Sequence, residues 1–246
     1  MIEKPAYDRL GLDYCEGRTP DPRWFEQIKE TIGTARTIVN VGAGTGSYEP
    51  SDRYVLAVEP SQVMIAQRPV GSAPCLVGYG EALPIANGQF DLATAFVTLH
   101  HWTDWRAGVR EMQRVAGRIA IVHFDPLEHA SFWLVRDYFP ELVRQWENVP
   151  SVDDVANLVR AKSVRTMPVP FDCVDGFLPA FWRRPHAYLD HEIRRRMSGL
   201  QLLDEGVLER GLRELRNDLQ SGRWMERHAA LMDQTELDVG WRLIAT

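Results

Sequence analysis

The sequence has few cysteines, no long apolar run and no excess of positive charge. Its three cysteines among 246 residues show no paired spacing, so the sequence predicts neither a disulfide framework nor a cysteine zinc site, and we expect no metal. The longest apolar runs, such as Ile119–Val122, are too short to span a bilayer. The first ten residues lack the apolar stretch of a signal peptide. We therefore expect a cytoplasmic protein that does not associate with membranes.

The charge balance argues against a nucleic-acid partner. With 34 acidic and 28 basic residues the net charge is −6, so no overall positive field attracts phosphate. The run Arg194-Arg195-Arg196 is a local basic cluster, but three arginines on a helix are more often a solvated face. Hydrophobic residues make up 45% of the chain, which is typical of a soluble globular domain. One domain over residues 1–246 fits this length.

Short β-branched runs alternate with helical patterns through the first half. Phe25, Ile28 and Ile32 recur at helical spacing in residues 20–34, and Asp104 can cap a second helix that ends at Ala116. Alternating strands and helices with short connections predict a Rossmann-like, doubly wound α/β sheet. The expected strands are 37–41, 54–58, 75–77, 90–97 and 118–124.

The pattern changes after residue 125. The pattern predicts helices over residues 126–163, which are rich in aromatics, and helices again over residues 186–232. Between them Val164–Phe171 predicts a sixth strand, weakened by Pro168 and Pro170, and 237–245 predicts a final strand. The expected parts are an N-terminal helical lid at 1–34, a cofactor-binding core at 37–125, a helical cap at 126–236 around the sixth strand, and the last strand at 237–246.

A glycine-rich turn directly follows the first strand. In Val39–Gly46, glycines 42, 44 and 46 let the backbone turn sharply and approach a ligand without interference from a Cβ atom. A dinucleotide fingerprint would place glycine where Ser47 stands. Glu59 ends the second strand, at the sheet edge where ligands bind, and a carboxylate there can accept two ribose hydroxyls. A ligand-free turn and a surface glutamate are the alternatives.

These motifs together resemble the class I S-adenosylmethionine-dependent methyltransferases of the broad type 11 family, which includes ubiquinone-biosynthesis methyltransferases. The resemblance implies a mostly parallel doubly wound sheet with an antiparallel last strand and a helical cap. It implies S-adenosylmethionine as cofactor and S-adenosylhomocysteine as product. The stretches that carry it are Val41–Gly46, Ala57–Ser61, Gly80–Pro84 with Phe90-Asp91, Leu99–Trp102, and Gly240–Ile244 at the last strand.

The resemblance also implies a role for each matching residue. Gly42 and Gly44 would pass the methionine part of the cofactor, Glu59 would bind the ribose, and Met64 would pack on the adenine. Residues 80–82 would border the polar edge of the adenine, and residues 96–97 would form the floor below the sulfonium. The expected cofactor-binding residues are Tyr14, Asn40, Gly42, Ala43, Gly44, Glu59, Pro60, Met64, Gly80, Glu81, Ala82, Phe96 and Val97.

The sequence departs from the family at three places. Asn40 and Tyr79 stand where the family usually has aspartate. Only about a dozen residues separate Gly46 from Glu59, too few for the usual helix and strand, so the first crossover must be short or irregular. We still expect cofactor binding, because the glycines and Glu59 are present.

The methyl group of a sulfonium is already activated, so the protein must chiefly align the reactants and exclude water. His101 follows the fourth strand and is our first candidate for a base or polar anchor, with His123 as the second. If the fourth strand continues through these residues, adjacent side chains point to opposite faces, and only one of His100 and His101 can face the site. A packing or capping role is the alternative for each.

Aromatic residues of the cap can wall an apolar pocket, although most of them can equally form the core of the cap. An aromatic, weakly acidic enclosure favours a small organic acceptor for the methyl transfer that the resemblance implies, and we expect a monomer or a homodimer. The alternatives are a non-catalytic S-adenosylmethionine-binding sensor or scaffold, an RNA methyltransferase and an NAD-dependent oxidoreductase. The expected pocket residues are Trp102, Trp133, Phe181 and Trp182.

Overall fold

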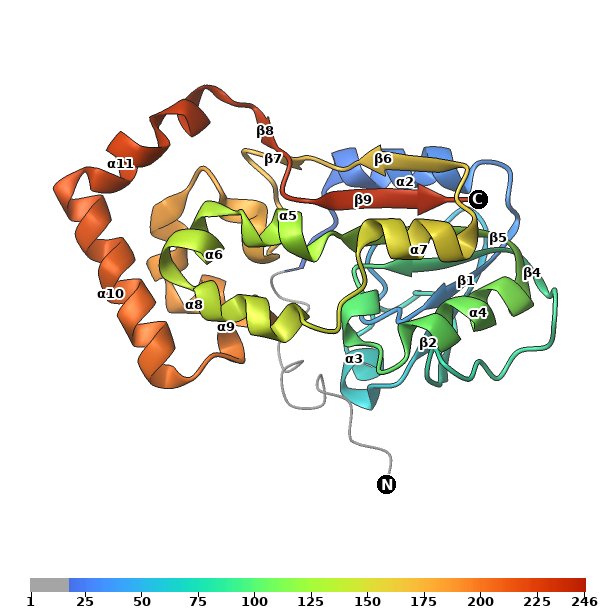
Figure 1. The fold of residues 1–246 in the computed structure, drawn as a ribbon. Coiled ribbons are helices and arrows are strands. Elements are labelled where there is room, and N and C mark those ends of the chain that lie inside the picture. The colour runs from blue at the N-terminus through green and yellow to red at the C-terminus, as the bar shows by residue number, and fades with distance from the viewer. Residues whose placement is uncertain (1–17) are drawn as a thin grey trace.

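A computed structural model describes residues 18–246, and the first half alternates strands and helices as expected (Figure 1). The helix predicted at 104–116 is present, and the Asp104 side chain caps it by accepting a hydrogen bond from the backbone of Ala107 at 3.0 Å. The elements are α2 (Pro22–Ile32), β1 (Thr37–Val41), β2 (Tyr54–Glu59), α3 (Gln62–Ala66), β3 (Cys75–Val77), β4 (Phe90–Phe96), η2 (Leu99–His101), α4 (Trp105–Val115) and β5 (Ala116–Phe124).

The second half is mostly helical, and it adds two strands, β6 and β9, to the main sheet. Its elements are α5 (Pro126–Ala130), α6 (Trp133–Tyr138), η3 (Pro140–Trp146), α7 (Val152–Val159), β6 (Ser163–Thr166), β7 (Val169–Pro170), η4 (Leu178–Phe181), η5 (Pro185–Leu189), α8 (His191–Arg194), α9 (Ser198–Gln201), α10 (Glu205–Ser221), α11 (Arg223–His228), η6 (Ala229–Asp233), β8 (Glu236–Leu237) and β9 (Trp241–Ala245).

The strands of the main sheet follow the order β3-β2-β1-β4-β5-β9-β6. Strands β1 to β5 pair in parallel, whereas β9 runs antiparallel to both β5 and β6. The predicted doubly wound sheet with an antiparallel last strand is therefore confirmed. The strand order reverses between β1 and β4, and ligands of such sheets bind at the carboxyl ends beside this switch.

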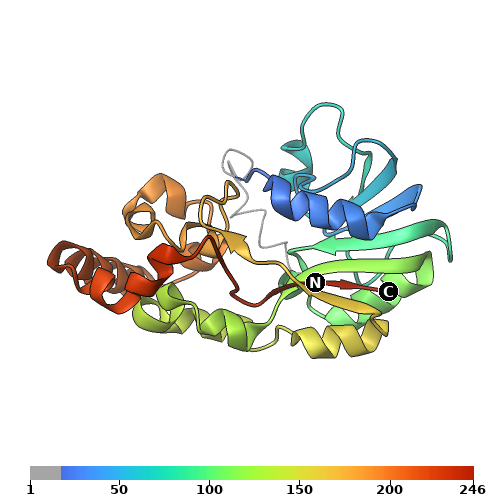
Figure 2. The ribbon, with the colours of Figure 1, turned by 90° about the horizontal axis from the view of Figure 1, so that it is seen from above.

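Two hydrophobic cores cover the two faces of the sheet. Side chains alternate along β5, so that Val122 and Phe124 belong to one core and Ile119 and Ile121 to the other. Figure 2 shows α2 on one side of the sheet and α7 on the other, with α10 and α11 beyond the end of the strands. The carboxyl ends of the parallel strands thus face the helical half. No helix within residues 18–246 is long and apolar enough to cross a membrane.

The structure departs from the predicted strands in the second half. The continuous strand expected over 164–171 is wrong, because β6 stops at Thr166 and the short β7 pairs with β8 in a separate sheet. Pro168 lies in the gap, and proline has no N–H to donate to a ladder. The final strand is also divided, at Gly240, whose φ of 90° is outside the range of strands. The short, irregular first crossover is confirmed, because no helix or strand lies between β1 and β2.

Candidate cofactor and methyl-transfer site

The glycine turn at the end of β1 lies against the connection that follows β4. Gly42 and Ala43 both donate their N–H groups to the carbonyl oxygen of Val58, at 2.9 and 3.1 Å, so the turn is held to β2. The φ angle of Gly42 is 68°. A Cβ atom on this residue would lie 2.1 Å from Oγ1 of Thr98. Position 42 therefore needs glycine for both conformation and space.

Replacing Gly42 by alanine should lower the melting temperature and weaken S-adenosylhomocysteine binding, since either the turn or Thr98 must move. Gly88→Ala is the matched control, because Gly88 has a similar φ of 63° but a Cβ atom there would meet no other atom within 4 Å. The strain of φ alone costs about 1–2 kcal/mol. Thermal unfolding and calorimetric titration of both variants would test this. An equal loss of stability and affinity in the two variants would show that the contact with Thr98 is unimportant.

Glu59 is buried at the end of β2 and holds the glycine turn. Its Oε2 accepts a hydrogen bond from the N–H of Gly44 at 2.8 Å, and its Oε1 accepts one from the N–H of Ser61 at 2.9 Å. Both oxygens of a carboxylate accept hydrogen bonds. Such a carboxylate fits the pair of ribose hydroxyls that the family resemblance implies.

Met64 lies beside the same turn. Ser61 accepts a hydrogen bond from the backbone of Met64 at 3.3 Å and so begins α3. The Met64 side chain is buried, and its Cε would be 3.3 Å from a Cβ atom on Gly44. The structure thus brings Gly44, Glu59 and Met64 together, with Pro60 in the connection between β2 and α3, and their cofactor contacts stay predictions.

A buried ion pair between Arg68 and Glu49 stabilises the glycine turn, and the sequence analysis did not predict this pair. Arg68 donates to Glu49 at 2.6 Å and to the carbonyl oxygen of Gly44 at 3.2 Å. Asn40 donates its side-chain N–H to Glu49 at 3.0 Å. Asn40 therefore reaches the site through Glu49, which fixes the path of the turn. No spacing signal marks Glu49 or Arg68, because one lies in the irregular crossover and the other follows α3.

The loop after β3 is attached to the start of α4. The Glu81 carboxylate accepts hydrogen bonds from the backbone of Thr103 at 2.9 Å and of Asp104 at 3.3 Å. Gly80 lies under the Trp102 ring, which would be 3.1 Å from a Cβ atom there. Tyr79 and Ala82 form an isolated antiparallel bridge. The adenine contacts of residues 80–82 and the pocket role of Trp102 stay predictions.

Backbone strain marks the end of β4. Val97 has a φ of 57°, a conformation that a β-branched residue adopts only at a cost of about 1–3 kcal/mol. Its N–H donates to the carbonyl of Val122 at 2.9 Å, which anchors it to β5. Phe96 precedes it, with its ring 6.4 Å from that of Tyr48. Strain of this kind concentrates at functional sites, and this one lies where the floor below the sulfonium is expected.

The expected continuation of the fourth strand through the two histidines is wrong, because β4 ends at Phe96 and His100 and His101 lie in η2, where successive side chains do not alternate between two faces. The ring centroids of His100 and His101 are 3.8 Å apart. His101 keeps contact with solvent, yet burial by the surrounding protein and then the charge of Arg18 lower the pKa of its ring to about 4. Burial lowers the pKa of His100 well below its usual value. Both rings are therefore neutral at pH 7.

His123, the second catalytic candidate, is buried beside β5. Its Nε2 is 2.9 Å from the carbonyl oxygen of Pro150, to which the N–H tautomer donates. Burial lowers the pKa of the ring to about 4. Alternation along β5 places His123 on the face of Ile121, which packs in the core with α4 and α7. A catalytic role for His123 stays a prediction.

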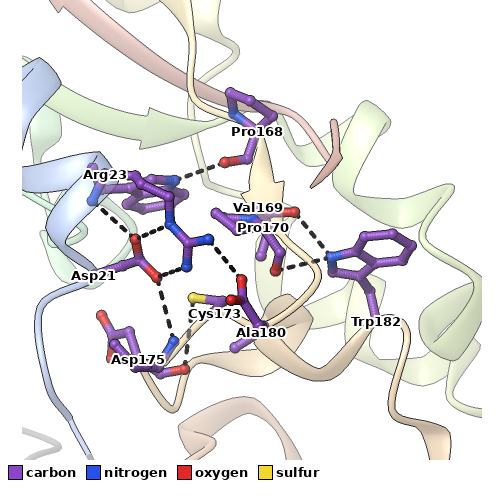
Figure 3. A network of polar contacts seen from close by, with 12 residues as sticks. Asp21, Arg23, Pro168, Val169, Pro170, Cys173, Asp175, Ala180 and Trp182 are labelled. Atoms are coloured by element: carbon purple, nitrogen blue, oxygen red, sulfur yellow. Dashed lines mark hydrogen bonds and ion pairs between the residues drawn. The ribbon is translucent and has the colours of Figure 1, made fainter. Parts of the chain in front are cut away.

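Two of the predicted pocket tryptophans lie in the core of the helical half. Trp133 donates its Nε1–H to the carbonyl of Trp182 at 2.9 Å, and Trp182 donates to that of Val169 at 2.9 Å, as Figure 3 shows for the second bond. Both side chains are buried, and Phe181 is half-buried beside them. Tyr14 lies outside the described residues. A pocket role for these aromatics stays a prediction.

Comparison with known proteins identifies the family. A model of the methyltransferase domain matches residues 39–121, the segment that holds the glycine turn and Glu59. A solved structure from Anabaena variabilis, a candidate methyltransferase of an antibiotic biosynthesis pathway, is 31% identical with a TM-score of 0.86. The alignment covers 94% of this chain and 98% of that one.

Other similar proteins agree with this assignment. Demethylmenaquinone methyltransferase of Corynebacterium efficiens is 29% identical over 158 residues, 60% of this chain and 69% of that relative. Geranyl diphosphate C-methyltransferase of Streptomyces coelicolor, solved with S-adenosylhomocysteine, shares the fold at 14% identity and a TM-score of 0.52, over 91% of this chain and 77% of its own. The chain is a methyltransferase and belongs to the class I S-adenosylmethionine-dependent methyltransferases.

Proposed function

We propose that the protein transfers a methyl group from S-adenosylmethionine to a small organic acceptor. The buried Glu59 carboxylate, fixed by the N–H groups of Gly44 and Ser61 beside a glycine turn, is the observation that supports the cofactor site. The cofactor supplies an activated methyl group, and the residues of this chain bind and orient the reactants around it. The acceptor lies, in this proposal, between the carboxyl ends of β4 and β5 and the helical half.

Two observations support a small acceptor over a nucleic acid. The net charge of −6 gives no overall attraction for phosphate. The curated relatives are named for demethylmenaquinone, which is a small molecule. We therefore take demethylmenaquinone as the first acceptor to assay.

His101 is the residue that we propose to orient the acceptor. It follows the strained Val97 and keeps contact with solvent. A base works best when its pKa lies near the working pH, whereas the pKa of this ring is lowered to about 4. A neutral imidazole at pH 7 fits a hydrogen-bond acceptor for a hydroxyl or amine better than a strong base.

Calorimetric titration with S-adenosylhomocysteine would test the cofactor site through Glu59→Gln. The amide keeps the size of the side chain but removes its charge and one acceptor oxygen. Hydrogen bonds to charged groups contribute about 1.5–3 kcal/mol, so affinity should fall by about tenfold or more. Glu209→Gln is the matched control, because Glu209 is exposed on α10 and should bind like the wild type.

Equal affinity of the Glu59 and Glu209 variants would contradict the role of Glu59. Formation of S-adenosylhomocysteine from S-adenosylmethionine in the presence of demethylmenaquinone would test the acceptor in a separate assay. Cofactor binding without turnover of this acceptor would retain the site and reject demethylmenaquinone.

A further inference from the structure

A pocket lies in the helical half, where η5 meets α10, α11 and η6. Its volume is about 360 Å³, near the lower end of the range of about 300–1,000 Å³ for small-ligand sites. Its lining residues fall between positions 183 and 232, outside the segment of residues 39–121 that carries the methyltransferase motifs. It therefore shares no lining residue with the turn at Gly42 and Glu59.

The pocket has an apolar lining. Trp224 is buried among its neighbours, while Leu219, Met225 and Met232 contribute aliphatic and thioether atoms. Met225 is 47% exposed, so its thioether is accessible from the pocket side of α11. Methionine side chains adapt their shape to apolar ligands. Such a lining suits the hydrocarbon body of a ligand.

Two neighbouring arginines also line this pocket, and both are held in place. Arg183 donates to the carbonyl of Gln234 at 2.7 Å and lies over the Phe171 ring at 4.3 Å. Arg184 donates to the carbonyls of Cys173 and Ala180, at 2.7 and 2.8 Å. The two guanidinium groups are thus oriented by backbone oxygens and an aromatic ring.

These guanidinium groups have no acidic partner among residues 18–246, since every described contact of Arg183 and Arg184 is to a carbonyl oxygen or a ring. The exposed His186 lines the same pocket and adds no negative charge. An apolar cavity whose lining includes two arginines without an acidic partner in this part of the chain is complementary to an anion with an apolar body.

We propose that this pocket binds a small amphipathic carboxylate. Its apolar body lies against Trp224 and Met225, and its carboxylate pairs with Arg183 and Arg184. The site goes beyond methyl transfer, because none of its residues belongs to the cofactor site. Binding there is independent of the proposed acceptor.

Dodecanoate, used below its micellar concentration, is the probe for this site. Calorimetric titration should show saturable binding of one dodecanoate per chain, and dodecyltrimethylammonium should bind at least about tenfold more weakly because it carries the opposite charge. The double variant Arg183→Gln/Arg184→Gln should lose about tenfold in affinity for dodecanoate. Arg110→Gln, an exposed arginine on α4, is the charge-matched control and should bind like the wild type.

Ala187→Phe tests the cavity itself, since Ala187 lines the pocket and a phenyl ring would fill part of it. Dodecanoate binding should be lost while S-adenosylhomocysteine binding and the circular dichroism spectrum stay unchanged. No saturable binding to the wild type would overturn the proposal. So would equal binding by wild type, Ala187→Phe and the double variant, because the probe would then adsorb elsewhere. If dodecyl phosphate alone bound, the site would be one for phosphate esters and the carboxylate assignment would be rejected.

Discussion

Asp175→Ala is expected to lower the free energy of unfolding by about 3 kcal/mol or more. Asp175 is 1% exposed and accepts hydrogen bonds from Arg18 at 2.5 Å and from the Tyr48 hydroxyl at 3.1 Å. The Arg18 side chain is itself 9% exposed. Removing the carboxylate leaves a buried guanidinium without this counter-charge, and breaking a buried pair in this way typically costs about 3–5 kcal/mol. Urea unfolding at pH 7 would measure the loss.

Asp172→Ala is the control within the same loop. Asp172 pairs with Arg23 at 2.6 Å, but its side chain is 55% exposed, so this pair should contribute at most about 1 kcal/mol. Figure 3 shows Asp175 near Cys173 and the Asp21–Arg23 pair that begins α2. Similar small losses in both variants would contradict the importance that we assign to the buried pair.

Most of the first half could be predicted because each element carries a local signal. The β-branched run of β1 stops at glycine, and Asp104 begins α4 through a hydrogen bond three residues away. The breaks in the second half depend instead on distant partners. The carbonyl of Pro168 accepts a hydrogen bond from the Trp24 ring at 2.8 Å, and the Gly240 backbone lies against Glu128 and Asp125.

Local signals also predicted one part of the site, whereas contacts between distant residues determine the rest. The glycine turn and Glu59 lie at the ends of consecutive strands, so alternation of elements alone brings them to one edge of the sheet. The Glu49–Arg68 pair joins an irregular crossover to the segment after α3, where no periodicity exists to align the two residues. Most helices of the second half are too short to show a helical periodicity of hydrophobic residues. The sequence therefore could not distinguish a core tryptophan such as Trp182 from a residue that lines a pocket.

Acidification from pH 6.5 to pH 4 is expected to destabilise the fold strongly. Burial lowers the pKa of His123 and of His129 to about 4, although each ring also bonds a carbonyl oxygen. In the unfolded chain the pKa of histidine is about 6.5, so the unfolded state binds more protons between these values. The contribution of each histidine to the free energy of unfolding is therefore fully present above about pH 6.5. It is lost as the pH falls toward 4, by at most about 3 kcal/mol for each histidine.

Urea unfolding at pH 7, 5.5 and 4.5 would measure this slope. His123→Gln should flatten it, because one buried proton acceptor is removed, whereas His186→Gln on the exposed side of η5 should leave it unchanged. An unaltered slope in the His123 variant would show that other groups control acid unfolding. Buried Asp21 is a poor candidate, because burial opposes its ionisation but hydrogen bonds from Arg23 outweigh this and hold its pKa below the usual value. Asp21 therefore gains its proton only below pH 3.8, the ordinary pKa of its side chain, so the histidines rather than Asp21 account for the expected slope between pH 6.5 and 4.5.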